Sequence, residues 1–284
     1  MKNILVATDF SNNAYCALFY ATQLLKSQPC TFYLLNTYNE LSLLEGENLP
    51  GFRGKKVMNQ LKAASEEGLA RTSYRIVLDN GNPNHQFKTI SKKGDLIKRV
   101  LKIIDNKEID LVVMGNKGQN QTRELFFGSN TIKVVNEMTN CPVLAIPGEM
   151  DYITPKDIAF VTDYRTGCQA ETIAPLLFLA TLLDASIKVI HINESKVLSN
   201  TQEINRGLLG TCLEGITHSY HEIYEFSDKA KTIDSTLDKF KIDLFSMVHN
   251  RRSLFQRLTR EPVIKDLSMY SDVPFLVLPN KESN

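Results

Sequence analysis

The strongest constraint on this 284-residue chain is that its second half repeats the first half in the same order. Four segments recur, and the repeats pair 3–10 with 157–164, 31–35 with 187–190, 108–114 with 241–247, and 140–147 with 272–279. Four recurrences in one order indicate an internal duplication. The chain is therefore expected to fold as two tandem domains, 1–148 and 156–280, separated by the breakers Pro147, Gly148 and Pro155.

Strand and helix signals alternate along the first copy. Apolar strand signals lie at 4–7, 31–35, 74–78, 110–114 and 143–146, and helix signals lie at 14–26, 56–71, after Gly94-Asp95, and at 129–137. Such alternation is typical of βαβ units, in which right-handed crossovers place helices on both faces of a parallel sheet. We expect an α/β fold made of two tandem doubly wound five-stranded parallel-sheet domains.

Composition excludes several classes of protein. The 33 Lys and Arg residues balance 32 Asp and Glu residues, so no electrostatic footprint for nucleic acid or an anionic membrane is present. The longest apolar run, 173–183, is shorter than the roughly 20 residues that span a bilayer. Five scattered cysteines without a CxxC pair are typical of reduced thiols, and we expect a cytoplasmic protein. His218 and His221, three residues apart on a strand, would face opposite sides, so no metal site is expected.

One motif carries chemistry. After the fourth strand the chain reads Met114-Gly115-Asn116-Lys117-Gly118, and nine residues after Gly118 comes Gly128-Ser129-Asn130. Ligands of open parallel sheets bind beyond the carboxyl ends of the strands. Glycine permits close backbone approach, and the free N–H groups at a helix start favour an anion. The motif therefore predicts a phosphate site, although the glycines by themselves would also serve turns and a helix cap.

The spacing Gly-x2-Gly-x9-Gly-Ser resembles the ATP-binding signature of the universal stress protein family. Thr8-Asp9-Phe10-Ser11 resembles the end of that family's first strand, Leu34-Leu35-Asn36-Thr37 its second strand, and Cys141-Pro142-Val143-Leu144 its last. The resemblance extends over the chain as two copies, so the sequence looks like a tandem member. It implies a Rossmann-like fold of the adenine nucleotide α-hydrolase type, with the two domains paired edge to edge through 143–146 and 275–278 as an intramolecular pseudo-dimer.

The resemblance also implies roles for individual residues in binding ATP, with Mg²⁺ as an optional companion. Ala7, Thr8 and Asp9 would lie at the nucleoside end, and Thr37 would present backbone groups to the adenine. Met114, Gly115 and Gly118 would face the ribose and first phosphates. Lys117 would reach a phosphate or remain an exposed loop lysine. The implied ligands of the outer phosphates are Gly128, Ser129 and Asn130.

The second copy departs from this motif, because no glycine follows Gly215. Alignment places Val248 at Gly115, Arg251 at Gly118 and Glu261 near Gly128. A β-branched residue forced into a left-handed turn would cost on the order of 1–3 kcal/mol. Glu261 would repel phosphate, and Pro262 removes a backbone donor. We expect that the second copy does not bind ATP in the same way.

The sequence is compatible with three functions. The first is a regulatory protein that binds ATP in its first domain, with no catalytic residues and at most slow ATP turnover. The second is an enzyme that hydrolyses or transfers phosphate with the help of Asp9. The third is a scaffold for an apolar ligand or a protein, in which the long connection 38–55 acts as a lid or docking loop. A protein partner and a further homodimer stay open in each case.

Overall fold

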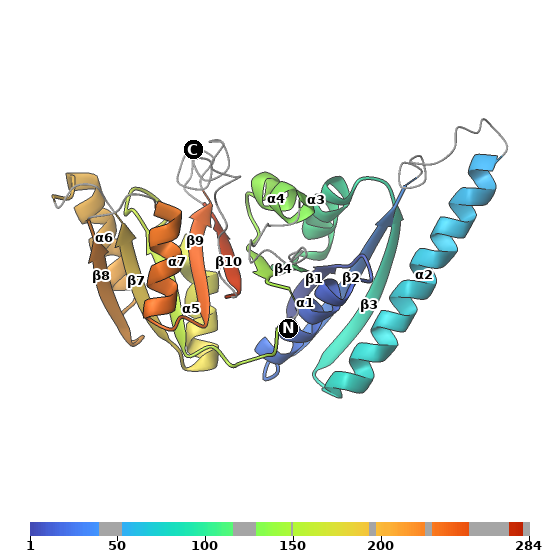
Figure 1. Cartoon of the computed structure of the whole chain (residues 1–284), viewed down its shortest axis with the longest axis horizontal. Coiled ribbons are helices and arrows are strands. Elements are labelled where there is room, and N and C mark those ends of the chain that lie inside the picture. Colours follow the sequence, from blue (N-terminus) through green and yellow to red (C-terminus); the bar gives the residue numbers. More distant parts are fainter. Residues whose placement is uncertain are drawn as a thin grey trace.

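The computed structural model of the chain describes residues 1–39, 53–115, 129–148, 150–192, 197–224, 229–249 and 273–280. Strands and helices alternate through both halves (Figure 1). The first half consists of β1 (Lys2–Ala7), α1 (Asn12–Leu24), β2 (Cys30–Tyr38), α2 (Arg53–Asn80), β3 (His85–Lys93), α3 (Leu96–Lys107), β4 (Leu111–Gly115), α4 (Ser129–Glu137) and β5 (Val143–Ile146). The second half consists of β6 (Asp157–Thr162), α5 (Ala170–Leu183), β7 (Ser186–Ile192), α6 (Asn200–Cys212), β8 (His218–Ile223), α7 (Lys229–Lys239), β9 (Leu244–His249) and β10 (Phe275–Pro279).

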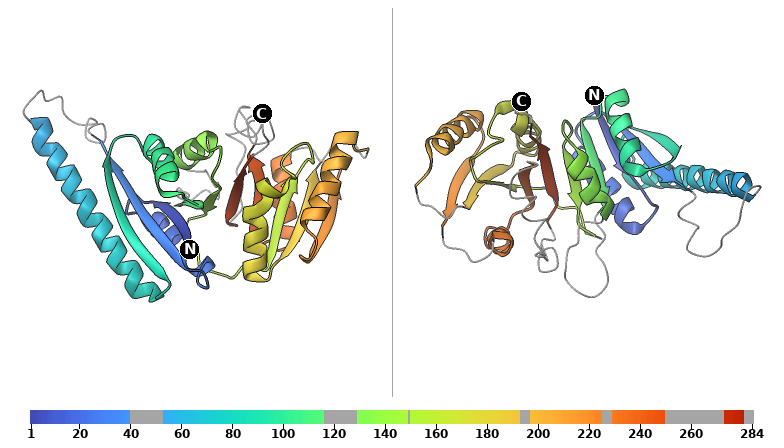
Figure 2. Two further views of the ribbon diagram at one scale, coloured as in Figure 1. Left: turned by 180° about the vertical axis from the view of Figure 1, so that it is seen from behind. Right: turned by 90° about the horizontal axis from the view of Figure 1, so that it is seen from above.

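All ten strands form one sheet in the order β3-β2-β1-β4-β5-β10-β9-β6-β7-β8. Within each half the strands are parallel, and the two halves have the same strand order. Strands β5 and β10 join the halves in antiparallel register, with Leu144 opposite Leu276. The expected pair of doubly wound sheets, joined through their last strands, is confirmed. Figure 2 shows the halves side by side, connected by a single passage of chain.

Two apolar layers cover the sheet, and each runs across both halves. One layer contains buried side chains of α1, α2, α5 and α6, and the other contains buried side chains of α3, α4 and α7. Buried strand residues such as Val113 and Leu244 complete the first layer, whereas Val112 and Phe245 complete the second. Because helices cover both faces of the sheet, a ligand can reach each half at the carboxyl ends of its strands. Among the helices in the described ranges, none has both the length and the apolar character needed to span a bilayer.

The expected third strand at 74–78 is wrong. These residues belong to α2, which is longer than the expected helix at 56–71, and the third strand is β3. Leu69 and Ile76 of α2 are buried at helical spacing, while Tyr74, Val77 and Leu78 are exposed on the outer side. A run of apolar residues on a helix surface therefore imitated a strand. The true strand was missed because β3 lies at the sheet edge and has a half-polar sequence, His-Gln-Phe-Lys-Thr-Ile-Ser-Lys-Lys.

The junction between the halves generates a stability prediction. Leu144 is fully buried and pairs with both Val113 of β4 and Leu276 of β10. Leu144→Ala should lower the free energy of unfolding by about 2–5 kcal/mol, because it removes buried methyl groups and leaves a cavity. Urea-induced unfolding measures this change. Ile204→Ala, at an exposed position of α6, is the control and should change stability by less than about 0.5 kcal/mol. Equal effects of the two substitutions would contradict the assigned junction.

Candidate functional site

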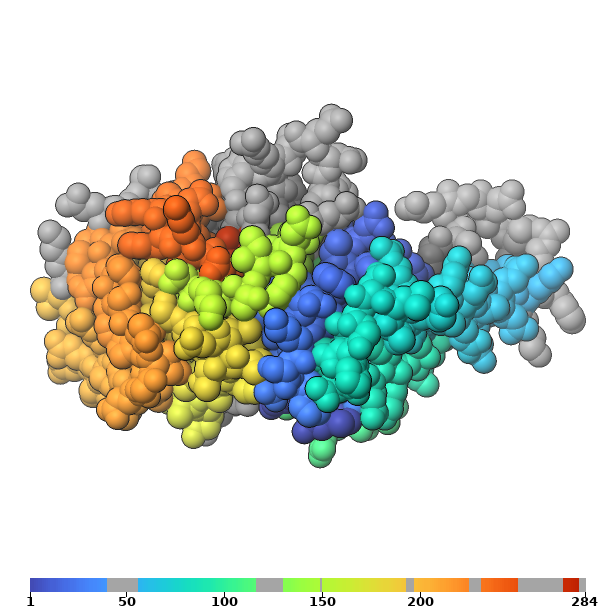
Figure 3. Space-filling view, turned by 90° about the horizontal axis from the view of Figure 1, so that it is seen from below, coloured from blue at the N-terminus to red at the C-terminus, as the bar shows by residue number. Residues whose placement is uncertain are grey.

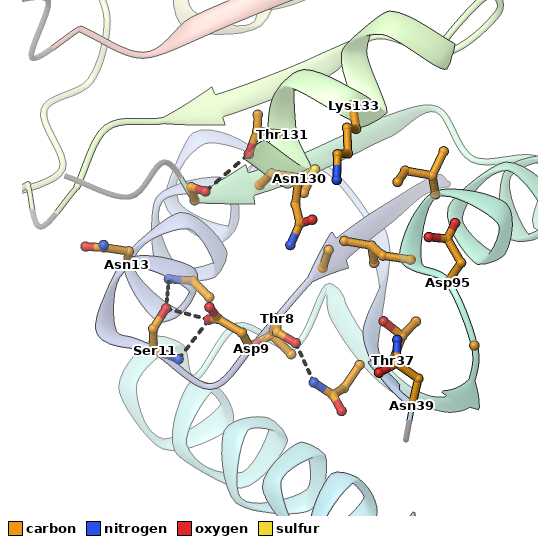
Figure 4. A pocket seen from close by; sticks show the side chains of 18 residues that line it. Thr8, Asp9, Ser11, Asn13, Thr37, Asn39, Asp95, Asn130, Thr131 and Lys133 are labelled. Atoms are coloured by element: carbon orange, nitrogen blue, oxygen red, sulfur yellow. Dashed lines mark hydrogen bonds between the residues drawn. The ribbon is translucent and has the colours of Figure 1, made fainter. Parts of the chain in front are cut away.

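A cavity of about 360 Å³ lies at the carboxyl ends of β1, β2 and β4 in the first half. Figure 4 shows polar side chains converging on it from several elements. The starts of α1, α3 and α4 close its sides. Its lining consists of Ala7, Thr8, Asp9, Ser11, Asn13, Ala14, Asn36, Thr37, Asn39, Gly94, Asp95, Leu96, Ile97, Met114, Gly115, Asn130, Thr131 and Lys133. The cavity lies at the strand edge where open parallel sheets bind their ligands.

Most of the residues expected at the site meet around this cavity. Its lining includes the expected residues Ala7, Thr8, Asp9, Thr37, Met114, Gly115 and Asn130. They come from β1 and the turn after it, from β2, from β4 and from α4, which lie far apart in the sequence. Ser129 is the first residue of α4, as expected for a helix that starts at the motif. Lys117, Gly118 and Gly128 lie outside the described residues, so their roles stay predictions.

The turn between β1 and α1 is held by its own side chains. Asp9 Oδ1 accepts hydrogen bonds from the backbone N–H and the hydroxyl of Ser11. Ser11 caps α1 by accepting a hydrogen bond from the Ala14 N–H at 3.3 Å. Thr8 Oγ1 accepts a hydrogen bond from the Phe10 N–H, and Phe10 has a left-handed backbone with φ of 67°. Asp9 is therefore committed in part to shaping the turn (Figure 4).

Asn36 contributes a link that the sequence reasoning did not assign. Its side-chain amide donates a hydrogen bond of 2.7 Å to the carbonyl oxygen of Thr8. This bond joins the end of β2 to the end of β1 on the cavity floor. In the second half, His191 Nδ1 lies 3.1 Å from the carbonyl oxygen of Thr162, the residue that corresponds to Thr8. Asn36 and His191 hold the same position in the repeat, and that match between two polar residues was the signal that could have identified Asn36.

The start of α3 forms a further wall, also not assigned from the motif. Gly94 has φ of 123°, and its N–H donates to the Tyr38 carbonyl oxygen at 2.9 Å. Asp95 caps α3 by accepting a hydrogen bond from the Lys98 N–H at 3.0 Å. Leu96 and Ile97 then present apolar side chains to the cavity. The site therefore has an apolar wall on one side and polar groups on the other.

Helix α4 supplies the one lysine among the described lining residues. Lys133 and Asn130 point into the cavity from the first turns of α4 (Figure 4). Thr131 Oγ1 donates a hydrogen bond to the Gly115 carbonyl oxygen at 3.5 Å, which ties α4 to the end of β4. The unpaired N–H groups of a helix start and a lysine ammonium both favour an anion. The sequence signal for Lys133 was its position one turn after Ser129.

The packing of β4 against α1 gives a reason for Gly115 besides the expected approach of a ligand. A Cβ atom at Gly115 would lie 2.6 Å from the Asn13 carbonyl oxygen and 3.1 Å from the Ala14 backbone nitrogen. Contacts below 3.0 Å force the backbone to move, and backbone moves less readily than a side-chain tip. Gly115 thus allows β4 to approach the first turn of α1, which lines the cavity. Close approach of a ligand is not needed to explain this glycine.

In the second half the glycine lies on the opposite side of the corresponding contact and faces a side chain instead of backbone. Val248 of β9 corresponds to Gly115, and Gly167, in the loop before α5, corresponds to Asn13. A Cβ atom at Gly167 would lie 2.6 Å from Val248 Cγ2. Val248 lies in a regular strand and not in a left-handed turn, so the expected strain at this valine is wrong. Val248 fits because the residue that faces it is Gly167, at the position that Asn13 occupies in the first half.

The loop after β6 is also packed differently from its counterpart. Tyr164 corresponds to Phe10 and shares its left-handed backbone, but it is 0% exposed, whereas Phe10 is 41% exposed. The Tyr164 ring stacks on His191 with 4.3 Å between ring centroids, and burial lowers the pKa of His191. Asn205 of α6 donates a hydrogen bond of 2.8 Å to the Tyr164 carbonyl oxygen. Helix α6 therefore holds this loop by a hydrogen bond to its backbone, whereas in the first half the Phe10 ring packs over Gly68 of α2.

Metal-ligating side chains do not cluster in the described part of the chain, where no group of three His, Cys, Asp or Glu residues could hold an ion. The five cysteines include no disulfide. The segment 250–272, which contains Arg251, Arg252, Arg257 and Arg260, and most of the connection 38–55 lie outside the described residues.

Comparison with known proteins points to one family. A model of the universal stress protein family matches residues 1–147. Universal stress protein MJ0577 of Methanocaldococcus jannaschii is 26% identical over 153 residues, which is 51% of this chain and 94% of that protein. Universal stress protein YxiE of Bacillus subtilis is 28% identical over 155 residues, which is 51% of this chain and 98% of that protein. Both relatives therefore correspond in length to half of this chain.

Solved structures resemble the whole chain. The crystal structure of a universal stress protein from Archaeoglobus fulgidus has a TM-score of 0.73, with 17% identity and coverage of 98% of this chain and 96% of that chain. A universal stress protein structure from Pseudomonas aeruginosa has a TM-score of 0.58 and 13% identity, and covers 98% of this chain and 93% of that chain. At these identities the likeness supports the fold, including its two halves.

The packing around Gly115 generates a prediction. Gly115→Ala should lower the free energy of unfolding by about 1–3 kcal/mol, because the new methyl group meets the backbone of α1. The matched control is Gly207→Ala on α6, where an added Cβ meets no atom within 4 Å. This control should raise stability by about 0.5–1 kcal/mol, since alanine is the better helix former. Thermal unfolding compares the two proteins, and a stable Gly115→Ala variant would contradict the close approach.

Proposed function

The chain belongs to the universal stress protein family, and on that basis we propose that its first half binds an adenine nucleotide, ATP above all. The binding site is the cavity at the ends of β1, β2 and β4. The chain acts by binding, and we assign no residue a catalytic role. The observation that carries the proposal is the convergence of seven expected residues, from three strands, one helix and the turn after β1, on one cavity.

The polarity of the cavity supports one orientation of the nucleotide. Asn130, Lys133 and the free N–H groups at the start of α4 favour the phosphates on that side. Thr37, Leu96 and Ile97 offer backbone polar groups and an apolar wall on the other side, which suits a purine base. Gly118, Gly128 and Ser129 extend the phosphate side by sequence. Mg²⁺ is carried largely by phosphate oxygens and water, so the proposal requires no cluster of protein ligands.

The expected strength is sufficient for a cellular nucleotide. A hydrogen bond to a charged group contributes roughly 1.5–3 kcal/mol. Micromolar affinity requires about 8 kcal/mol. Three or four bonds to phosphate oxygens, together with partial burial of the base against Leu96 and Ile97, reach this range.

We propose a single nucleotide site in each chain. The sequence suggested that Val248, at the position of Gly115, would obstruct a nucleotide in the second half. Its side chain instead packs on Gly167, so Val248 gives this proposal no support. The remaining support is the sequence that follows β9, where Arg251 and Glu261 replace the motif glycines and Pro262 lacks a backbone donor. These residues lie outside the described ranges. The fixed loop at Tyr164 adds a second difference between the halves.

Dedicated phosphate chemistry is the less favoured alternative. Asp9 is the residue that it would use, and Asp9 Oδ1 already accepts two hydrogen bonds from Ser11. No histidine is among the lining residues described for the cavity. A general base must reach the proton that it removes, and no such pair of residues is assigned. The proposal is therefore a binding protein whose ATP turnover, where present, is slow.

Calorimetry on the full chain tests the proposed function. ATP should bind with a stoichiometry of one, and the Gly118→Val, Gly128→Val double variant should lose binding, because branched side chains obstruct the phosphate turn. Gly207→Val, on the exposed side of α6, is a control for the extra volume and should retain binding. Two sites per chain, or no binding by protein stripped of nucleotide, would refute the proposal. Turnover near 10 per second, a value typical of enzymes, would favour the catalytic alternative.

Lys133 generates a prediction that depends on the phosphate chain. Lys133→Ala should weaken ATP binding by about 10-fold to 100-fold, because a charge-assisted bond is worth roughly 1.5–3 kcal/mol. The same variant should leave adenosine binding unchanged, since adenosine lacks phosphate. Lys107→Ala, at the end of α3 and away from the cavity, is the matched control. Equal losses for ATP and adenosine would place Lys133 away from the phosphates.

A further inference from the structure

A second cleft lies where the two halves meet, at the end of the sheet opposite the nucleotide cavity. Its volume is about 420 Å³. Figure 3 shows the side of the molecule on which α5, in yellow, adjoins the first segments of the chain, in blue. The cleft is lined by Lys2, Ile4, Leu25, Ile109, Asp110, Leu111, Asn140, Pro142, Ala174, Pro175, Phe178, Leu179 and Leu276.

The lining has the composition of a small-molecule site. Ten of its thirteen residues are apolar, and the polar residues are Lys2, Asp110 and Asn140. Lys2 Nζ lies 3.0 Å from Asp110 Oδ1 and 5.1 Å from the centroid of the Phe178 ring. Small-molecule pockets are typically apolar, with a few polar groups that fix orientation. The ammonium and carboxylate together provide both a donor and an acceptor next to an aromatic ring.

The duplication provides a second cleft for comparison. Antiparallel pairing of β5 with β10 relates the two halves by an approximate two-fold axis, so each cleft has a counterpart. Asp243 corresponds to Asp110, because each carboxylate accepts a backbone N–H at the start of the first strand of its half, from Asp157 and Asn3 respectively. Ile158 corresponds to Ile4 by the strand registers. The counterpart cleft therefore lies between α1 and the start of β9.

In the counterpart position, the chain itself inserts a phenol ring. Tyr152, in the connector between the halves, packs edge-on against Tyr20 of α1 with 5.1 Å between ring centroids. Burial raises the pKa of Tyr20, and Tyr152 and Asp243 act in the same direction. Tyr152 packs against the apolar layer of that face. The connector passes between the halves once, so it fills one cleft and leaves the other open.

We propose that the open cleft at Lys2, Asp110 and Phe178 binds a small phenolic molecule. Its ring takes the place that Tyr152 occupies in the counterpart, among Ile4, Phe178 and Leu179. Its hydroxyl group interacts with Lys2 and Asp110. The cleft shares no lining residue with the nucleotide cavity, so the inference does not depend on the proposed function.

Methyl NMR of the full chain, labelled at isoleucine, tests the inference with p-cresol, the analogue of the tyrosine side chain. The methyl signals of Ile4 and Ile109 should shift saturably, with a dissociation constant on the order of 1 mM for so small a molecule. Toluene, which lacks the hydroxyl group, should bind about 10-fold more weakly. Equal binding of toluene would overturn the assigned role of Lys2 and Asp110. Absence of saturable shifts at Ile4 and Ile109 would overturn the site.

Three variants sharpen the test. Ala174→Phe, at an exposed position of α5 that lines the cleft, should weaken p-cresol binding at least 10-fold. Ala64→Phe, the same change at an exposed position of α2, should leave binding unchanged. Tyr152→Ala should open the counterpart, so that the Ile158 methyl signal also shifts and a second p-cresol binds. Unchanged binding by Ala174→Phe, or no second site in a folded Tyr152→Ala protein, would overturn the inference.

Discussion

The antiparallel pairing of β5 with β10 is the interaction on which the rest of the structure depends. Each half alone would end in an exposed apolar strand, and such edges need a partner. Pairing Leu144 with Leu276 joins the two sheets and makes both apolar layers continuous across the junction. Because this pairing is antiparallel, the strands of the two halves point in opposite directions. The carboxyl ends of the strands therefore lie at one end of the sheet in the first half and at the other end in the second half. The cavity of the first half is therefore built by the first half alone.

Within this shared frame, the two halves have diverged at one packing contact. The last inner strand of each half approaches the start of a helix or its preceding loop, and each half has a glycine on one side of this contact. The first half places that glycine on β4, at Gly115, and the second places it at Gly167, opposite Val248. In the first half the glycine makes room for the backbone of α1, and in the second half it makes room for the Val248 side chain. Gly115 shows that a glycine within a ligand motif can also serve packing.

Much of the fold could be predicted from the sequence, because local patterns and the repeat agree. The strand at 143–146 and the helix at 129–137 match β5 and α4 in their bounds, since each has clear breakers beside it. The assignment at 74–78 was wrong because exposed apolar residues of α2 imitate a strand. Asn36, Asp95 and Lys133 were missed because their place at the cavity depends on strand register and on how helices pack. No local pattern contains that information. The glycine motif, by contrast, can be recognised from the spacing of its residues along the chain.

The central claim is that a duplicated fold retains one nucleotide site, formed by the first half. Native mass spectrometry of the intact chain, titrated with ATP after removal of any bound nucleotide, tests this claim most directly. The account predicts a mass increase of one ATP per chain at saturation. Saturation with two ATP molecules per chain, or a chain that takes up none, would contradict it.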